Sequence, residues 1–302
     1  MIFPGNVSPR GRHAGAYDPS TSMGRKFFRL SLVLVLLFVL SWPFVEPFLL
    51  QTEHATLTGP DLPASIGQMR LVYASDIHKG GLFGEKRVAA LVSNINACNA
   101  DLVLLGGDYA TDIESAIEFF QSLPRIHSRY GVYAVLGNHD RTIPESRLTT
   151  LRSAMQTAGV TPLVNAVAKV RIGLSEIYIA GIDDADNGRD DMKAVASQVR
   201  AEDYVIFLSH TPKVIPDALT LRDMNGREGW FDLGLFGHTH GGQVAFLGPL
   251  LKDDGVPDEY TQGWFRQNRA DMLVSRGVGT SGLPVRLFCM PQIHLITVNT
   301  AK

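Results

Sequence analysis

The chain has 302 residues, in which 28 Lys and Arg stand against 30 Asp and Glu, so its formal net charge is −2. This near-neutral balance argues against a dedicated nucleic-acid-binding protein, which normally carries a basic excess. Hydrophobic residues make up 45% and charged residues 19%, which excludes a disordered or collagen-like chain. The only cysteines, Cys98 and Cys289, are too few for a disulfide scaffold or a cysteine-rich zinc module.

The N-terminal segment differs in composition from the rest. Residues 1–23 are rich in Gly, Pro and Ser without periodicity, so we expect them to be disordered, and Met23 is an alternative translation start. Residues 24–50 contain the uncharged apolar run 30–45, which predicts a single-pass transmembrane anchor in a bacterial cytoplasmic membrane. A cleaved signal peptide and a buried soluble helix remain alternatives.

Charge and composition around this run predict its orientation and its connection to the rest. Arg25, Lys26 and Arg29 precede it, and such a basic flank stays cytoplasmic, which would place the following domain on the extracytoplasmic side. Residues 51–68 are polar with Gly and Pro, so we expect a linker there, followed by one catalytic domain over 69–302.

From Met69 onwards, apolar runs of strand length alternate with helical patterns. Strands are expected at 69–75, 101–107 and 131–137, and helices at 85–98, 114–123 and 144–159. The segments AVAKVRIG and SEIYIAGID alternate as in a β-hairpin. Further strands are expected at 204–209, 233–237, 243–246, 271–277 and 292–298. This order predicts an α/β fold with two packed sheets and helices outside them.

Five of the predicted strands end in residues that can bind a metal ion. These are, in chain order, Asp76 with His78, Asp108, Asn138 to Asp140, His210, and His238 with His240. Ligands of open α/β sheets bind beyond the carboxyl ends of strands, where such side chains can converge. A single Asp in this position is usually a turn or cap residue, and a single His is usually just hydrogen-bonded. Five strand ends that all carry such residues in one chain are poorly explained as turns, caps or isolated hydrogen bonds.

The ordered motifs DxH, GGD, GNHD, SH and GHTHGGQ closely resemble those of the calcineurin-like metallophosphoesterase superfamily, and the resemblance extends over residues 69–298. The apolar N-terminal segment and the SRGVG, RLFCMP and HLITV motifs are similar to a bacterial membrane-associated subgroup. Some members of that subgroup hydrolyse the pyrophosphate bond of UDP-2,3-diacylglucosamine in lipid A biosynthesis. The resemblance implies a four-layer α/β/β/α sandwich, the metallo-dependent phosphatase fold.

The resemblance also implies two divalent metal ions and a set of ligands. One metal would be bound by Asp76, His78 and His240, the other by Asn138, His210 and His238, with Asp108 as the bridge between them. Mixed oxygen and imidazole ligands suit Mn²⁺, with Fe, Zn²⁺ and Mg²⁺ as alternatives. A hydroxide between the metals would attack the phosphorus, and His139 would stabilise or protonate the leaving oxygen.

The chain departs from the family's protein phosphatases, which have the motif GDxxDRG. Here the segment 107–113 has one extra spacer and lacks the Arg that grips phosphate, which argues against a protein phosphatase. The departure also leaves open which carboxylate orients His139, with Asp112 and Asp140 as the alternatives.

Three further features have two interpretations each. Arg141 would either grip a substrate phosphate or, as we prefer, form a surface ion pair. Asp183 and Asp184 would be a third polar cluster or, preferably, a loop turn. The segment 257–265, which includes Trp264, would be a substrate- or lipid-contacting lid or, preferably, a packed loop.

The sequence therefore predicts a membrane-anchored phosphoesterase that cleaves a phosphodiester or pyrophosphate bond in a nucleotide-lipid or phospholipid-type substrate. An extracytoplasmic domain favours a phospholipid head group, whereas a helix lying on the inner leaflet would favour UDP-2,3-diacylglucosamine. A catalytically silent binding or scaffold protein is the competing interpretation, but it would be expected to lose ligands or His139, and all are present. A nuclease would need a basic, aromatic-lined groove, which the composition does not favour.

Overall fold

The computed structural model describes residues 22–81, 83–141, 145–244 and 255–301. The disorder expected for residues 1–23 therefore lies outside the described residues up to residue 21, and it is wrong at Ser22 and Met23, which begin helix α1. The chain divides into two compact units, Met1–Trp42 and Pro43–Lys302. Helix α1 (Ser22–Val45) accounts for the described part of the first unit and continues into the second. The segment Gly24–Phe48 has a mean hydropathy of 2.2 and is long and apolar enough to cross a membrane, a criterion that a signal sequence also meets.

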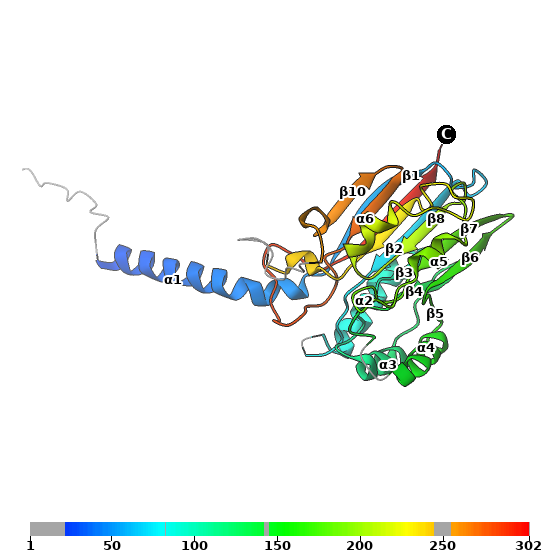
Figure 1. Ribbon diagram of the computed structural model, residues 1–302. Coiled ribbons are helices and arrows are strands. Elements are labelled where there is room, and N and C mark those ends of the chain that lie inside the picture. Colours follow the sequence, from blue (N-terminus) through cyan, green and yellow to red (C-terminus); the bar gives the residue numbers. More distant parts are fainter. Residues whose placement is uncertain (1–21, 82, 142–144, 245–254, 302) are drawn as a thin grey trace, which may run out of the picture. The chain divides into compact units, whose positions relative to one another are not determined.

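Two six-stranded sheets form the centre of the second unit (Figure 1). The first has the order β1 (Gln51–Gly59), β12 (Gln292–Thr300), β2 (Gln68–Ala74), β3 (Leu102–Leu105), β4 (Val132–Ala134) and β5 (Val160–Pro162). The second has the order β10 (Gly263–Gln267), β11 (Ala270–Val274), β9 (Leu233–Phe236), β8 (Val205–Leu208), β7 (Ser175–Gly181) and β6 (Ala166–Ile172). Within each sheet the central strands are parallel, so their carboxyl ends lie at one edge.

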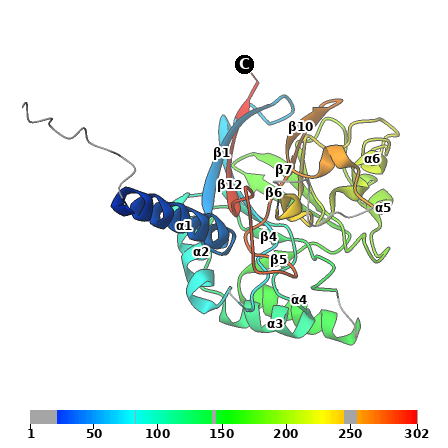
Figure 2. The same ribbon diagram turned by 90° about the vertical axis from the view of Figure 1, so that its left-hand side faces the viewer.

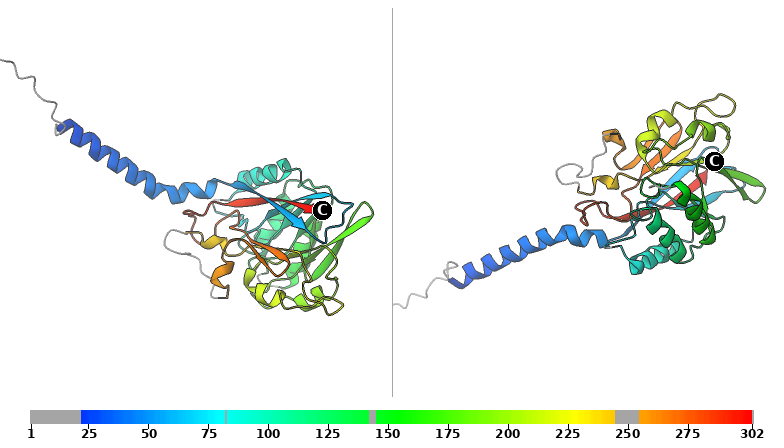
Figure 3. Two further views of the ribbon diagram at one scale, coloured as in Figure 1. Left: turned by 90° about the horizontal axis from the view of Figure 1, so that it is seen from above. Right: turned by 60° about the horizontal axis from the view of Figure 1, so that its bottom comes forward.

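Helices cover the outer face of each sheet (Figure 3). The helices α2 (Glu85–Ala97), α3 (Ile113–Ser122) and α4 (Leu148–Thr157) pack on the first sheet, whereas α5 (Met192–Ala196) and α6 (Ile215–Ala218) pack on the second. Side chains alternate along the strands: Val72 joins the helix-facing core, and its neighbours Leu71 and Tyr73 join the core between the sheets. The predicted α/β/β/α sandwich is therefore confirmed.

The linker predicted for residues 51–68 is wrong over its first half. Residues 51–59 form β1, which pairs in parallel with β12 from Gln51 opposite Gln292 to Gly59 opposite Thr300 (Figure 2). β1 is an edge strand whose residues alternate between exposed and partly buried, and Leu57 packs against the core between the sheets. Edge strands often carry polar side chains, so the composition of this one resembled that of a linker.

The structure also bears on two predictions for the C-terminal part of the chain. The strand expected at 243–246 begins instead with a turn, because Gln243 has φ +56° and follows the short helix η4 (His240–Gly242), while residues 245 and 246 lie outside the described residues. The segment 257–265 contains helix η5 (Asp258–Tyr260) and the start of β10, an edge strand on which Trp264 is partly exposed. Tyr260 is buried and Phe265 packs against the helix-facing core of the second sheet, so these two residues are packed.

His294 provides a test of the core through pH. It is buried on β12, its Nε2 lies 3.2 Å from Ser275 Oγ, and burial followed by the charge of Arg276 lowers its pKa to about 3. Since the unfolded chain protonates this ring near pH 6.5 and the folded chain does not, its contribution to stability is complete above that pH and is lost on acidification towards pH 3.

We therefore expect acidification from pH 7 to pH 5 to destabilise the wild type by about 2 kcal/mol more than His294→Phe. Urea unfolding of the full chain in detergent at both pH values measures this difference, and other titrating groups cancel between the two proteins. Equal pH dependence of the two proteins would contradict a neutral buried His294.

Candidate active site

The ends of five parallel strands bring the predicted ligands together. Asp76 and His78 follow β2, Asp108 follows β3, and Asn138 with His139 follows β4, all in the first sheet. His210 follows β8, and His238 with His240 follows β9, so the second sheet supplies the remaining imidazoles. Three overlapping groups of these residues have ligand atoms within 4.8 Å of one another, a spacing that can hold metal ions.

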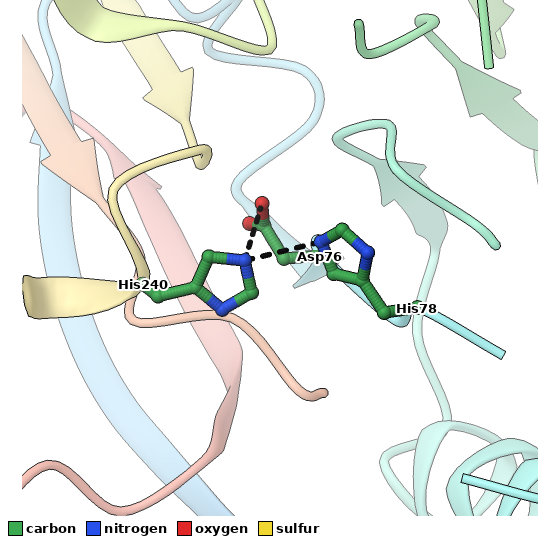
Figure 4. Close-up of side chains that lie close together, drawn as sticks. All are labelled: Asp76, His78 and His240. Atoms are coloured by element: carbon green, nitrogen blue, oxygen red, sulfur yellow. Dashed lines mark hydrogen bonds and ion pairs between the residues drawn. The ribbon is translucent and has the colours of Figure 1, made fainter. Parts of the chain in front are cut away.

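The first group contains Asp76, His78 and His240, drawn in Figure 4. His240 Nε2 lies 3.1 Å from His78 Nε2 and 3.7 Å from Asp76 Oδ1. All three side chains are buried. Two ring nitrogens and a carboxylate oxygen facing one point form a donor set suited to a divalent cation.

Asp108 connects this group to a second one, which contains His210 and His238. Its Oδ2 lies 3.4 Å from His78 Nε2 and 3.3 Å from His210 Nε2, and His210 Nε2 is also 3.2 Å from His238 Nδ1. One carboxylate therefore lies between imidazoles of the two groups. The structure thus brings together Asp76, His78, Asp108, His210, His238 and His240, as expected from the sequence.

Two observations show that these residues fit bound cations. The Nδ1 of His210 lies 2.8 Å from the carbonyl oxygen of Gly106, which can only accept, so Nδ1 carries a proton and Nε2, which faces Asp108, is the nitrogen that a cation would bind. The side-chain oxygen of Asn138 is buried and has no hydrogen-bond partner among the described residues. An oxygen in this state normally has a ligand, because leaving it unpaired costs about 1–3 kcal/mol.

His139 lies beside both groups but is held differently. Its ring meets the His78 ring edge-on at 5.0 Å, and its Nδ1 lies 3.0 Å from the carbonyl oxygen of Thr111. That acceptor places a proton on Nδ1 and leaves Nε2 as the atom that can exchange a proton. Because a ligand atom of His139 is also within 4.8 Å of His78 and Asp108, metal binding by this ring is geometrically possible as well.

The two carboxylates considered for orienting His139 bind backbone N–H groups instead. Asp112 caps α3 by accepting the N–H of Ser115 at 2.9 Å. Asp140 is completely buried and accepts the N–H groups of Asp108, Tyr109 and Gly137. It therefore ties the loop after β3 to the loop after β4, and the carbonyl of Thr111 takes the orienting role.

Much of the site has an unusual backbone conformation. Five of the expected ligands have φ between +46° and +70°: Asp76, His78, Asp108, His238 and His240. A non-glycine residue there costs about 1–2 kcal/mol, so the surrounding structure must impose it. Two glycines leave room for the carboxylates, because a Cβ on Gly137 would lie 2.1 Å from Asp108 Oδ1 and one on Gly237 would lie 2.4 Å from Asp76 Oδ2.

Burial and mutual charge set the protonation of the ligands. Burial would lower the pKa of His210, but the charges of Asp108 and Asp76 outweigh it and raise this pKa well above its usual value. Burial would raise the pKa of Asp108, but His210 and His78 hold it below its usual range. The pKa of His240 is well below normal because of burial, His78 and Arg286. Asp108 is thus an anion that attracts cations.

Arg141 does not point freely into the site. Its guanidinium forms an ion pair with Asp183 at 2.9 Å, and both side chains are buried, so the preferred ion pair exists but lies inside the protein and not on its surface. Burial raises the pKa of Asp183, against the opposing effect of Arg141. Asp184 accepts the N–H groups of Asp186 and Asn187, which is the expected loop turn.

That turn contains a site residue that the sequence did not single out. Asp186 Oδ2 lies 3.5 Å from His238 Nδ1, and Asp186 Oδ1 lies 2.7 Å from Lys213 Nζ. The turn follows β7, so β7 is a sixth strand whose carboxyl end supplies a polar side chain to this edge. The run of acids at 183–186 after an apolar strand was the available signal.

Comparison with known proteins identifies the family. The model of the calcineurin-like phosphoesterase family matches residues 69–242. The chain belongs to this family. It is therefore a metal-dependent phosphoric ester hydrolase whose Asp and His clusters form a divalent metal site.

Several curated proteins are similar over most of the chain. A metallophosphoesterase of Aquifex aeolicus is 27% identical, covering 86% of this chain and 95% of its own length, and YkuE of Bacillus subtilis is 26% identical, covering 86% and 89%. A "transmembrane protein with metallophosphoesterase domain" of Danio rerio is 31% identical over 80% of this chain and 55% of its own. Among solved structures, a phosphopantetheinyl hydrolase of Mycobacterium tuberculosis aligns with a TM-score of 0.40 at 12% identity, covering 70% of this chain and 91% of that one.

Gly237→Ala tests the close approach of backbone and ligand. The new Cβ would collide with the carboxylate of Asp76, so we expect the affinity for Mn²⁺ to fall by about 10–100-fold. Isothermal titration calorimetry on metal-free full chain in detergent measures the affinity. Gly84→Ala is the control, because a Cβ there meets open space and φ is −81°. Wild-type affinity in Gly237→Ala would contradict the tight fit.

Proposed function

We propose that the protein is a binuclear phosphodiesterase or pyrophosphatase. The observation that carries this proposal is the position of the Asp108 carboxylate, 3.4 Å from the Nε2 of His78 and 3.3 Å from the Nε2 of His210. Asp76, His78 and His240 would hold one cation, and His210, His238 and Asn138 the other, with Asp108 between them. Bound there, two cations would activate water as the nucleophile and neutralise charge on the phosphoryl oxygens.

The protein's own groups supply orientation and proton transfer. The N–H of His238 donates to Asp76 Oδ1 at 2.9 Å, and the N–H of His139 donates to Asp108 Oδ1 at 3.0 Å, so both carboxylates are fixed in place. His139, held through Nδ1 by Thr111, would present Nε2–H to the departing oxygen as a general acid. A leaving alkoxide or phosphate of a diester or pyrophosphate needs such a proton.

We further propose that α1 anchors the enzyme in a bacterial cytoplasmic membrane, with Arg25, Lys26 and Arg29 on the cytoplasmic side and the catalytic domain outside. On this basis a phospholipid-type head group fits better than a cytoplasmic nucleotide lipid. Mn²⁺ is the first metal to test, because hard oxygen ligands and imidazoles are both present.

The class of substrate is tested with two chromogenic esters. We expect the metal-free full chain in detergent, given Mn²⁺, to hydrolyse the diester bis-p-nitrophenyl phosphate faster than the monoester p-nitrophenyl phosphate. Absorbance of p-nitrophenol measures both rates. No turnover of either ester with any divalent cation would overturn the proposal and favour the silent scaffold.

Single substitutions separate the proposed roles. His139→Ala should keep two metal ions per chain and lower kcat by about 10²–10⁴-fold, because only the general acid is lost. His210→Ala should lose one of the two metal ions. Metal analysis by mass spectrometry, together with turnover of a diester whose leaving group is an alkoxide and not p-nitrophenolate, reads both effects, and His127→Ala, outside every motif, is the control. Loss of a metal from His139→Ala would make that ring a ligand.

A further inference from the structure

The strand order carries the chain from the apolar segment directly to the edge of the candidate site. β1 begins at Gln51, which pairs with Gln292 at the start of β12 (Figure 2). β12 is antiparallel to β2, with His294 opposite Tyr73, so the start of β12 lies at the carboxyl end of β2, next to Asp76. Only Leu49 and Leu50 separate β1 from helix η1 (Glu46–Phe48), where the apolar segment ends. That end therefore lies at the metal-binding edge of the sheets.

Three backbone N–H groups attach this end to the loop between β11 and β12. Arg286 N–H donates to the carbonyl of Pro43 at 2.9 Å. The carboxylate of Glu46, completely buried, accepts the N–H of Phe288 at 3.0 Å and that of Cys289. Consecutive N–H groups that converge on one anion form a nest, which requires a left-handed residue, and Phe288 has φ +55°. A bulky residue held in this strained conformation suggests a functional reason for its position.

The other side of the same loop contacts the metal ligands. Cys289 Sγ donates to the carbonyl of His240 at 3.1 Å, and Arg286 Nη2 lies 3.4 Å from His240 Nδ1. Gly279 N–H donates to the carbonyl of Asp76 at 2.6 Å. The loop is therefore fixed between the end of the apolar segment and two of the candidate ligands.

The loop exposes large apolar side chains. Leu283 is 59% and Phe288 64% exposed, beside Phe44 at 58% and Phe48 at 50% in the attached segment. Residues 277–291 contain no acid, and their single charged residue, Arg286, is completely buried. Among the described residues after Leu49, the other large hydrophobic side chains with comparable exposure are Leu174, Met224 and Trp264. An acid-free apolar surface continuous with a membrane helix is suited to the bilayer interface.

We propose that residues 279–289 form a membrane lip: a loop that Glu46 holds at the end of α1 and that inserts Leu283 and Phe288 into the bilayer interface. The lip would keep the metal-binding edge at the membrane surface. Resting on the proposed function, it further implies a substrate whose phosphoester group lies at that surface and whose acyl chains stay in the bilayer.

Site-directed spin labelling tests the lip without any activity measurement. Leu283→Cys, Phe288→Cys and Leu174→Cys are labelled in the full chain, because Cys98 and Cys289 are buried. Leu174 is the matched control: it is a fully exposed leucine between β6 and β7, at the amino end of β7 and so at the opposite edge. The proteins are reconstituted into liposomes of phosphatidylethanolamine and phosphatidylglycerol.

We expect labels at 283 and 288 to be more accessible to oxygen, which partitions into lipid, than to a water-soluble nickel chelate. The label at 174 should show the reverse. Labels at 283 and 288 that behave like the one at 174 would overturn the lip.

Glu46→Gln tests how the lip is held. Losing the anion removes the charge that two N–H groups share, so the label at 288 should become more accessible to nickel while the label at 174 stays unchanged. An unchanged label at 288 would contradict the holding role of Glu46.

The substrate class is tested with Leu283→Asp. We expect hydrolysis of phosphatidyl-p-nitrophenol in vesicles to fall about tenfold, because a carboxylate resists entry into the interface. Hydrolysis of bis-p-nitrophenyl phosphate in detergent should stay unchanged. If the labels enter lipid but vesicle hydrolysis is unaffected, the implied substrate class is wrong. If the wild type cleaves neither ester, the proposed function fails, and the labels still decide on the lip.

Discussion

The buried carboxylate of Asp108 is the point on which the rest of the structure depends. It lies between His78 and His210, and it accepts the N–H of His139. A carboxylate inside a protein is stable only when cations and donors surround it. Meeting this requirement brings the ends of β2, β3, β4 and β8 to one place, which joins the two sheets through a single anion.

Bringing these ends together strains the backbone. Each left-handed turn at Asp76, His78 or Asp108 is unfavourable, and the two sheets provide the energy that imposes it. Their strands are buried on both faces, since helices pack on the outside and the other sheet packs on the inside. Asp140 adds a direct constraint by accepting three backbone N–H groups from the loops after β3 and β4. Packing of the two sheets and the hydrogen bonds of Asp140 therefore set the positions of the ligands.

The sequence was sufficient for features that depend on local patterns. The apolar runs at 69–75 and 204–209 appear as β2 and β8, and the ligand-type residues directly after them lie at the expected edge. Features that depend on contacts between residues distant in the sequence could not be predicted from local patterns. The edge strand β1 is defined by its pairing with β12, and Asp186 matters only because β7 lies beside β8. The burial of Arg141 likewise follows from its contact with Asp183.

The directions of β1, β12 and β2 explain why the apolar segment ends at the same edge as the site. β1 is parallel to β12, and β12 is antiparallel to β2, so the start of β1 must lie at the carboxyl end of β2. A helix placed immediately before β1 can then only end at the edge that carries the ligands, and two intervening residues leave little freedom to turn away. The same strand directions place the loop before β12 at that edge. There Glu46 accepts N–H groups of the loop, and Cys289 of the loop donates to the carbonyl of His240. Adding β1 to the sheet thus fixes the chain immediately after the apolar segment at the edge that carries the ligands.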